Sequence, residues 1–430
     1  MRVLGPDRRL RAGPQTKSRI VDTGIHGHRP LLSLLAANAV SQMGNMMVQA
    51  VAIPWFVLET TGSATRTGLT GAAIAVGAVV PSALGGPLVD RVGFKRSSIV
   101  ADLASAATIA AIPVLHLADM LAFWHLLLLA FLMAALNAQG DTARLALLPT
   151  LADSAGMPVE KANAADRSIA RFGQLAGPAI AGILVVLIGA SNVLFVDAAT
   201  FTVSALIVAA GIPRQTGEGR GETRSNYLSD LVEGFSALRA NRPVMSMAYL
   251  ATVGNFLDVP LVTVVLPVYA MALYGSAASL GFVVGAFAAG AIIGALLFGI
   301  LKRHPPRRIM FLLSFAVAAV LVYGTLVSKP PLGILVAAAG IGGIVAGPIN
   351  PLFLTVIQET TPTRLLGRVS GAINGLVQAA IPFGAVLAGI AIEGLGLIET
   401  VLIMGTVYLT VIAVMSFNRA LHTIDKEGIA

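Results

Sequence analysis

Long apolar stretches recur along the chain, and short polar segments separate them. Each stretch is about 20 residues or longer, which is the length that a helix needs to cross the roughly 30 Å hydrocarbon core of a bilayer. The pattern therefore predicts twelve membrane-spanning helices. Their ranges are approximately 31–59, 66–89, 97–117, 121–149, 166–189, 192–213, 243–274, 279–301, 309–328, 331–359, 369–394 and 397–417.

The second half of the chain repeats the first at a fixed distance. Ile53-Pro54, Gly62-Ser63-Ala64, Gly68, Gly77 and Gly86 recur as Leu266-Pro267, Gly275-Ser276-Ala277, Gly281, Gly290 and Gly299. Each displacement is 213 positions, about half of the 430 residues. Because both copies are apolar, we expect an all-α membrane protein of two pseudo-symmetric six-helix bundles with a cavity between them.

Polar stretches divide the chain into five expected parts. In the longest polar connection, six apolar residues from Tyr227 to Leu238 stand at helical spacing and predict a short amphipathic helix along the membrane interface. A plain solvated linker helix is the alternative. The parts are a basic tail over 1–30, an N-terminal bundle over 31–213, a linker over 214–242, a C-terminal bundle over 243–418 and a second tail over 419–430.

Composition and charge fix the expected orientation. The chain is 56% hydrophobic and 12% charged, with a mean hydropathy of +0.83, whereas about a quarter of the residues in soluble proteins are charged. Of the 29 Lys and Arg residues, 27 fall on the side of the N-terminal tail, which leaves Arg66 and Lys329 on the other. Since cytoplasmic loops carry the excess of positive charge, we expect both termini in the cytoplasm and a plasma (inner) membrane location.

The net charge of +8 follows from this bias, so we expect anionic membrane lipids as partners and no nucleic acid. The chain has no cysteine, which excludes disulfides and thiolate metal sites. We expect neither a cofactor nor a metal. The apolar run from Leu31 to Leu58 is far longer than a signal-peptide core, and we expect it to remain as the first membrane helix.

A charged, glycine-containing loop joins the second and third predicted spans: Gly86-Pro-Leu88-Val-Asp90-Arg91-Val-Gly93-Phe-Lys95-Arg96. It resembles the signature loop of the major facilitator superfamily. Further matches are Ala146-Leu-Leu148-Pro149, Gly177-Pro178-Ala-Ile-Ala-Gly182, Asp197-Ala-Ala-Thr-Phe201, Asp230-Leu-Val-Glu233-Gly234-Phe, Arg242-Pro243 and Gly367-Arg368-Val369. Within the superfamily, the chain is similar to the drug and siderophore exporters, including enterobactin exporters and macrolide-efflux proteins. The resemblance covers residues 31–417 and implies the twelve-helix major facilitator fold.

The resemblance also implies that the signature loop latches a cytoplasmic gate. Asp90 is expected where the second span leaves the membrane, among cations, and its carboxylate can pair with them or cap a helix N-terminus. Glycines permit the tight backbone of a short loop. A simple positive-inside anchor is the alternative. The expected gate residues of the loop are Gly86, Asp90, Arg91, Gly93, Lys95 and Arg96.

Three charged residues in the following spans complete the expected gate. Asp102 lies about 9 Å into its helix, within reach of Arg144, Arg167 or Arg171. Asp141 and Arg144 are three positions apart on one helix and can form a local pair. We therefore expect gate or structural ion pairs at Asp102, Asp141 and Arg144.

The fifth span contains Gly173-Gln174-Leu-Ala-Gly177-Pro178, which resembles the antiporter motif of drug and proton exchangers. Glycines four positions apart allow a close helix approach, and proline bends a helix. The eleventh span repeats Gln174 and Pro178 as Gln378 and Pro382. Ordinary small-residue packing is the alternative to a hinge. The expected hinge residues are Gly173, Gly177, Pro178 and Pro382.

Polar side chains at helical spacing mark the expected cavity between the bundles. The 213-residue shift maps Gln42 onto Asn255 and Asn45 onto Asp258, so each pair is expected at one depth across the pseudo-twofold axis. The expected cavity residues are Asn38, Gln42, Asn45, Gln49, Thr252 and Asn255.

Asp258 is expected near the middle of the membrane, since it is about 15 positions from either end of its span. A carboxylate there costs roughly 2.5 to 3.5 kcal/mol on insertion scales, and it can load and release a proton as water access alternates. We predict that Asp258 couples proton entry to export. A neutral, hydrogen-bonded structural aspartic acid is the alternative.

Together these features predict a secondary transporter, not an enzyme, that exports a small amphipathic organic molecule in exchange for protons and works as a monomer. The substrate could be drug-like, macrolide-like or siderophore-like. An ion-coupled importer of a small nutrient is the first alternative, and a receptor without transport activity is another. An integral membrane enzyme acting on lipids or isoprenoids is a remote one, because the chain has no Asp-x-x-Asp pair or Glu-x-x-His motif.

Overall fold

The structure is a computed structural model that describes residues 27–84, 92–213, 227–300 and 305–425. Within these ranges the chain is helical and has no strand. The N-terminal half contains α1 (Arg29–Met47), α2 (Ile53–Thr61), α3 (Ala64–Leu84), α5 (Phe94–Leu117), α6 (Phe123–Ser154), α7 (Val159–Ile188) and α8 (Ala190–Gly211). The C-terminal half contains α10 (Arg242–Pro260), α11 (Leu266–Tyr274), α12 (Ala277–Ile300), α13 (Arg307–Val327), α14 (Leu332–Ala346), α15 (Ile349–Thr360), α16 (Leu366–Ala379), α17 (Ile381–Leu395) and α18 (Leu397–Ser416). The linker helix α9 (Tyr227–Ala240) lies between them in the chain.

Eleven helical spans in the described ranges are long and apolar enough to cross a membrane. Helix α3 covers residues 66–84 of the remaining expected span, 66–89, and residues 85–89 lie outside the described ranges. Large apolar side chains such as Leu187 (70% exposed) and Ile300 (73% exposed) lie on the outside of the bundle. A water-soluble protein would bury most of such a surface, whereas lipid accommodates it. The chain is therefore a multi-pass membrane protein.

The 213-residue repeat reappears in the backbone. Helices α1 and α10 each continue into a π-helical segment, Val48–Ala52 and Leu261–Val265, before α2 and α11 begin. The prolines that follow, Pro54 and Pro267, have no N–H to donate to the carbonyl four positions back, which removes an α-helical hydrogen bond at each site. The preceding residue instead donates to a carbonyl five positions back in both copies.

The turns after α2 and α11 are also equivalent. Both helices end at a glycine in the left-handed conformation, Gly62 with φ 63° and Gly275 with φ 62°. Glycine adopts this conformation at little cost and is the usual residue there. The shared Gly-Ser-Ala sequence therefore encodes the same tight turn twice.

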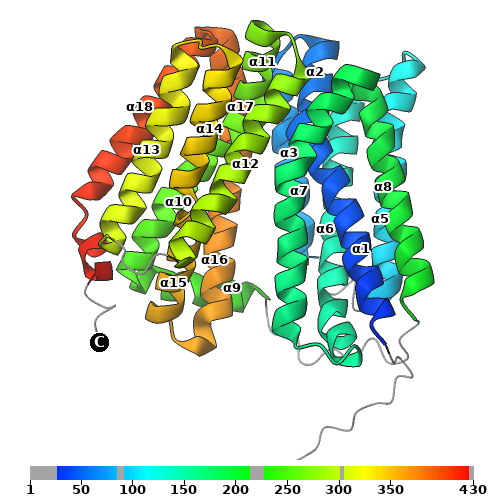
Figure 1. Ribbon diagram of the computed structural model, residues 1–430, viewed down its shortest axis with the longest axis horizontal. Helices are drawn as coiled ribbons and strands as arrows, with labels where there is room; N and C mark the ends of the chain where they lie inside the picture. The colour runs from blue at the N-terminus through cyan, green and yellow to red at the C-terminus, as the bar shows by residue number, and fades with distance from the viewer. Residues whose placement is uncertain (1–26, 85–91, 214–226, 301–304, 426–430) are drawn as a thin grey trace, which may run out of the picture.

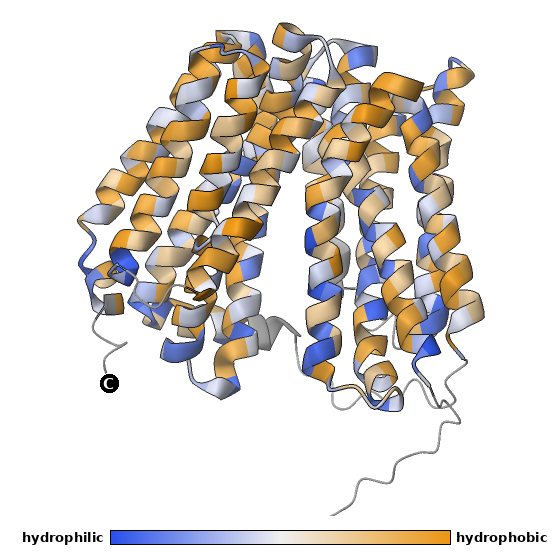
Figure 2. Cartoon of the chain, viewed as in Figure 1, coloured by the Kyte–Doolittle hydropathy of each residue, from blue (hydrophilic) through white to orange (hydrophobic). Residues whose placement is uncertain are grey.

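The two halves meet along two helix pairs, α7 with α12 and α3 with α17. We call the end of the bundle with the turns at Gly62 and Gly275 the hairpin end, and the end with α9 the linker end. In Figure 1 the halves converge at the hairpin end and spread apart toward the linker end. Figure 2 shows hydrophobic residues over most of the helices and hydrophilic residues gathered toward the linker end.

Small residues make the contact between the halves close. A Cβ on Gly182 of α7 would lie 2.7 Å from the carbonyl oxygen of Ala277 on α12, and one on Gly281 would overlap the carbonyl of Pro178. On the other pair, a Cβ on Gly68 of α3 would overlap the carbonyl of Ala385 on α17. Backbones touch directly at these points, which is how small residues let membrane helices associate.

Candidate functional site

A buried arginine joins two carboxylates in the N-terminal half. Arg144 on α6 donates from Nη1 to both carboxylate oxygens of Asp102 on α5, at 2.7 and 2.9 Å, and from Nη2 to Oδ1 of Asp141 at 2.7 Å. The side chains of Arg144 and Asp102 are fully buried, whereas that of Asp141 is 36% exposed. Ser204 on α8 donates to the second oxygen of Asp102 at 2.7 Å. The three charged residues therefore link α5 to α6, and Ser204 joins α8 to them. Two carboxylates and one guanidinium together carry one net negative charge.

Local sequence explains why this network forms. Asp141 and Arg144 are three positions apart, so both project from one face of α6. Gly140 on the same helix leaves room for the partner helix, because a Cβ there would lie 3.3 Å from Oδ1 of Asp102. The expected gate residues Asp102 and Asp141 thus both contact Arg144, and all of these contacts lie within the N-terminal half.

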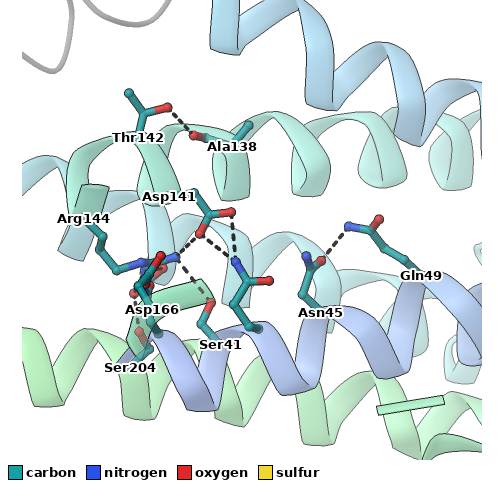
Figure 3. Close-up of polar contacts among 12 residues, drawn as sticks. Ser41, Asn45, Gln49, Ala138, Asp141, Thr142, Arg144, Asp166 and Ser204 are labelled. Atoms are coloured by element: carbon teal, nitrogen blue, oxygen red, sulfur yellow. Dashed lines mark hydrogen bonds and ion pairs between the residues drawn. The ribbon is translucent and has the colours of Figure 1, made fainter. Parts of the chain in front are cut away.

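The polar stripe of α1 extends the network (Figure 3). Gln42 donates from Nε2 to both oxygens of Asp141, at 3.3 and 3.4 Å. One turn away, Asn38 donates from Nδ2 to Oδ1 of Asp166 on α7 at 2.5 Å. At the other end of the stripe, Gln49 donates to Oδ1 of Asn45 at 2.6 Å. The stripe therefore presents amides to carboxylates near the linker end and a pair of amides at the first π segment.

A cavity of about 170 Å³ lies between the two halves, beneath the contacts at the hairpin end. Its polar lining comes from Gln49 of the first π segment, Thr67 of α3, Thr263 of the second π segment and Gln378 of α16. Apolar residues line the rest: Ile53, Pro54, Gly71, Ile74, Ala75, Ala78, Val79, Val259 and Ile381. The two π segments contact each other beside it. This mixed lining can hold an amphipathic molecule.

Only one of the six expected cavity residues, Gln49, lines this space. Asn38, Gln42 and Asn45 precede it on α1, and Thr252 and Asn255 precede it on α10, all on the side toward the linker end. Thr252 donates to the carbonyl of Ala248 in its own helix. The six expected cavity residues did not include Thr67, Thr263 or Gln378. A signal for Gln378 was present, because it is the repeat of Gln174 in the antiporter-like motif.

The side chain of Asp258 is directed into its own half. Its carboxylate does not face Asn45 across the axis but accepts a 2.8 Å hydrogen bond from the hydroxyl of Tyr408 on α18 and a 3.3 Å bond from that of Tyr323 on α13. Gly254, one turn earlier, makes this possible, because a Cβ there would lie 3.0 Å from the Tyr408 hydroxyl. The side chain therefore points into its own half.

Asp258 borders a second cavity, of about 110 Å³, whose lining residues all belong to the C-terminal half. The lining is apolar apart from Asp258 and its two tyrosines, and it includes Phe287 and Phe315. Asn45 and Asp258 keep equivalent register, since each stands three positions before a π segment. The repeat thus fixes their depth, whereas the residues around each decide which way it points.

Of the remaining expected gate residues, three lie outside the described residues and three lie within them. Gly86, Asp90 and Arg91 lie outside the described residues. Gly93 precedes α5 with φ 90°, and Lys95 donates to the carbonyls of Ala209, at 2.8 Å, and Ile212 at the end of α8. Cations stabilise the C-terminal end of a helix, so Lys95 holds α5 against α8. Arg96 is exposed.

The expected hinge residues differ in setting. Helix α7 continues through Pro178 without a break, and a Cβ on Gly177 would lie 2.8 Å from Cβ of Met46 on α1. Gly173 likewise faces the backbone of Gln42, 3.4 Å from where its Cβ would be. Pro382 follows the interruption between α16 and α17. The glycines thus permit close packing of α7 on α1, and the helix break is at the second site.

Comparisons with known proteins agree with this architecture. The family model described as Major Facilitator Superfamily matches residues 34–275 and 248–427. The chain is 32% identical over 402 residues to the multidrug efflux pump Tap of Mycolicibacterium fortuitum, covering 92% of this chain and 97% of that protein. It is 23% identical over 401 residues to macrolide efflux protein A of Streptococcus pyogenes, with the same two coverages.

Among solved structures, the nucleoside transporter NupG superposes with a TM-score of 0.73 at 11% identity, over 90% of this chain and 98% of that one. A D-xylose-proton symporter superposes with a TM-score of 0.67 at 12% identity, over 90% and 96%. At such low identity these likenesses establish the fold alone.

Proposed function

Because the chain belongs to the Major Facilitator Superfamily, we propose that it exports a small amphipathic organic molecule from the cytoplasm by alternating access. The observation that carries this proposal is the identity of 32% with a multidrug efflux pump across 92% of the chain. The substrate class is drug-like, which includes macrolide-like and siderophore-like molecules. The transporter functions as a monomer in the plasma membrane.

The distribution of Lys and Arg residues indicates the side of the membrane toward which the two halves are open. The linker end carries the Lys- and Arg-rich loops, so the positive-inside rule assigns it and both termini to the cytoplasm. The halves touch at the hairpin end and spread toward the linker end (Figure 1). A substrate can then enter from the cytoplasmic side and lodge between the π segments. Export requires the hairpin end to open and the linker end to close.

The chemistry of the path supports an amphipathic and preferably neutral or cationic substrate. Asp141 exposes part of its carboxylate beside Gln42 on the approach, and the cavity offers the amides of Gln49 and Gln378 among apolar side chains. Amide groups can donate and accept hydrogen bonds, so they suit ligands of varied shape.

We propose proton exchange as the energy source, with Asp258 as the proton site of the C-terminal half. One charge crossing about 150 mV gains roughly 3.5 kcal/mol, which sustains a substrate gradient of about 300-fold. Because Asp258 faces Tyr323 and Tyr408, protonation acts through the packing of α10 and not by direct contact with substrate. The hinge role of Gly173, Gly177, Pro178 and Pro382 and the gate role of the signature loop belong to the same proposal.

The proposal is tested by expressing the chain in a bacterial host that lacks its own drug exporters. We expect lowered susceptibility to at least one macrolide or other amphipathic antibiotic and lowered accumulation of a fluorescent drug. A protonophore should restore the accumulation. Uptake of a nutrient such as a nucleoside or sugar, with unchanged drug susceptibility, would favour the importer alternative instead.

A further inference from the structure

A carboxylate of the C-terminal half binds the start of a helix in the N-terminal half. Oε1 of Glu393, on α17, accepts hydrogen bonds from the hydroxyl of Ser63 at 2.6 Å and from the backbone N–H of Thr65 at 3.0 Å. Its Oε2 accepts one from the Thr65 hydroxyl at 2.6 Å. One acidic side chain thus makes three hydrogen bonds across the boundary between the halves, at the hairpin end.

The carboxylate of Glu393 lies at a site that favours a negative charge. Thr65 lies in the first turn of α3 (Ala64–Leu84), where backbone N–H groups lack partners within the helix and carry the positive end of the helix dipole. Ser63 has a double role, because its hydroxyl also accepts from the backbone N–H of Arg66 at 3.1 Å. Glu393 therefore completes the cap of α3 from the opposite half.

Close backbone packing places Glu393 there. One turn earlier on α17, a Cβ on Gly389 would lie 2.5 Å from the carbonyl oxygen of Ala64 and 2.8 Å from Cα of Thr65. Two turns earlier, Ala385 packs against Gly68 of α3. Three successive turns of α17 therefore contact α3, and Glu393 is the outermost contact. Separation of the two halves at this end must break its hydrogen bonds.

The repeat supplies an internal comparison. The duplicated Gly-Ser-Ala turn gives Ser63 an equivalent, Ser276, at the start of α12. Gly182 packs against Ala277 as Gly389 packs against Ala64, so the position equivalent to Glu393, four residues after the glycine, is Val186. The α7–α12 interface is made of small residues such as Gly182 and Gly281. Within the described ranges no carboxylate contacts Ser276. Both copies kept the serine, but only one interface has the acid, so general helix packing does not require Glu393.

We propose that Glu393 is the latch of the outer gate: its bonds to Ser63 and Thr65 hold the hairpin end closed while the linker end is open. In the transport cycle the latch releases as the linker end closes, and the substrate leaves past α3 and α17. This assignment of the outer side depends on the proposed export function. The hydrogen bonds of Glu393 to Ser63 and Thr65 do not depend on the export function.

Because the chain has no cysteine, spin labels can be attached at introduced cysteines without background. A hairpin-end pair, Ala118→Cys with Ser328→Cys, and a linker-end pair, Glu160→Cys with Thr363→Cys, use exposed positions in opposite halves. Distances are measured by double electron–electron resonance in the purified full-length protein in nanodiscs. The variants are Glu393→Gln, Glu393→Ala and Ser63→Ala, and Glu399→Gln is the matched control, an exposed acid at the same end.

We expect Glu393→Gln and Glu393→Ala to raise the population with a longer hairpin-end distance at least fivefold and to shorten the linker-end distance. Ser63→Ala should do the same to a smaller extent, and Glu399→Gln should leave both distributions unchanged. Unchanged distributions in both Glu393 variants would overturn the latch, as would an equal shift in Glu399→Gln. Drug efflux by the wild-type chain is measured separately. If the Glu393 variants shift the distances but the wild type exports no drug, the latch is supported and the export proposal fails. If the wild type exports drug but the Glu393 variants shift no distance, the export proposal is supported and the latch fails.

Discussion

Tyr408 on α18 donates a 2.8 Å hydrogen bond to Asp258 on α10, a residue 150 positions earlier in the chain. Together with Tyr323 it holds the only described carboxylate on the apolar cavity of the C-terminal half. A buried carboxyl group without partners would be costly, so the two hydroxyls make Asp258 tolerable inside the membrane. The same bonds connect α10, which also carries Asn255, to the outer helices of its half.

Asp258→Asn should reduce substrate-driven proton flux in proteoliposomes at least tenfold, because the amide cannot take up and release a proton. Tyr408→Phe is the matched control. It keeps the ring packing against Phe315 and Tyr323 and leaves the carboxylate with one donor, so it should retain flux. Unchanged flux in Asp258→Asn would remove this residue from the coupling mechanism.

Arg144→Met should lower the free energy of unfolding by about 3 to 5 kcal/mol, because it leaves the buried carboxylate of Asp102 without its charge partner. Combining it with Asp102→Leu should recover much of the loss, since the pair then becomes apolar. Thermal unfolding in detergent measures both. Arg171→Met, at an exposed arginine that bonds Gln174, serves as control and should stay within about 0.5 kcal/mol. Equal stability of Arg144→Met and the control would contradict the role given to this ion pair.

Gln378→Leu should weaken substrate recognition, because its amide lines the cavity between the halves. The loss of one neutral hydrogen bond, about 0.5 to 1.5 kcal/mol, corresponds to a change of roughly two- to tenfold in the apparent transport KM. Gln174→Leu, at the equivalent position outside that cavity, should leave KM unchanged. A larger effect at Gln174 than at Gln378 would move the substrate path away from the cavity.

Gly281→Ala should disturb the contact between α7 and α12, since a Cβ there overlaps the carbonyl of Pro178. We expect the hairpin-end distance to lengthen and export to slow severalfold. Gly324→Ala on α13, where a Cβ meets nothing within 4 Å, is the control and should behave as the wild type. Identical distances in Gly281→Ala and the control would show that this contact does not hold the halves together.

Much of the fold was predictable from the sequence because membrane physics leaves few choices. A chain that crosses a bilayer must hydrogen-bond its own backbone N–H and C=O groups, which a helix does. The lengths of the apolar runs therefore give the spans, and the 213-residue repeat predicts equivalent turns at Gly62 and Gly275. The linker helix was also predicted from its spacing and is present as α9. Its attachment to α16 through the ion pair of Glu233 with Arg368 was not.

The site was less predictable, because periodicity identifies a helix face but not the partner it meets. The stripe from Asn38 to Gln49 was a real face of α1, yet its partners Asp141 and Asp166 come from other helices. For Asp258, equivalence with Asn45 gave a depth but could not give the direction of the side chain, since the tyrosines that orient it are 65 and 150 positions away and have no marker in the sequence. Glu393 and Ser63 are 330 positions apart, and no local sequence pattern predicts their contact.

Transport in oriented proteoliposomes tests the central claim most directly. The purified chain is reconstituted, molecules with the linker end outside are selected by labelling an introduced Thr363→Cys, and a fluorescent amphipathic drug is added outside with the lumen at lower pH. Our account predicts drug accumulation in the lumen accompanied by proton release, and loss of both when the pH gradient is collapsed. No accumulation that depends on the pH gradient, or loss of drug preloaded into the lumen together with the protons, would contradict the account.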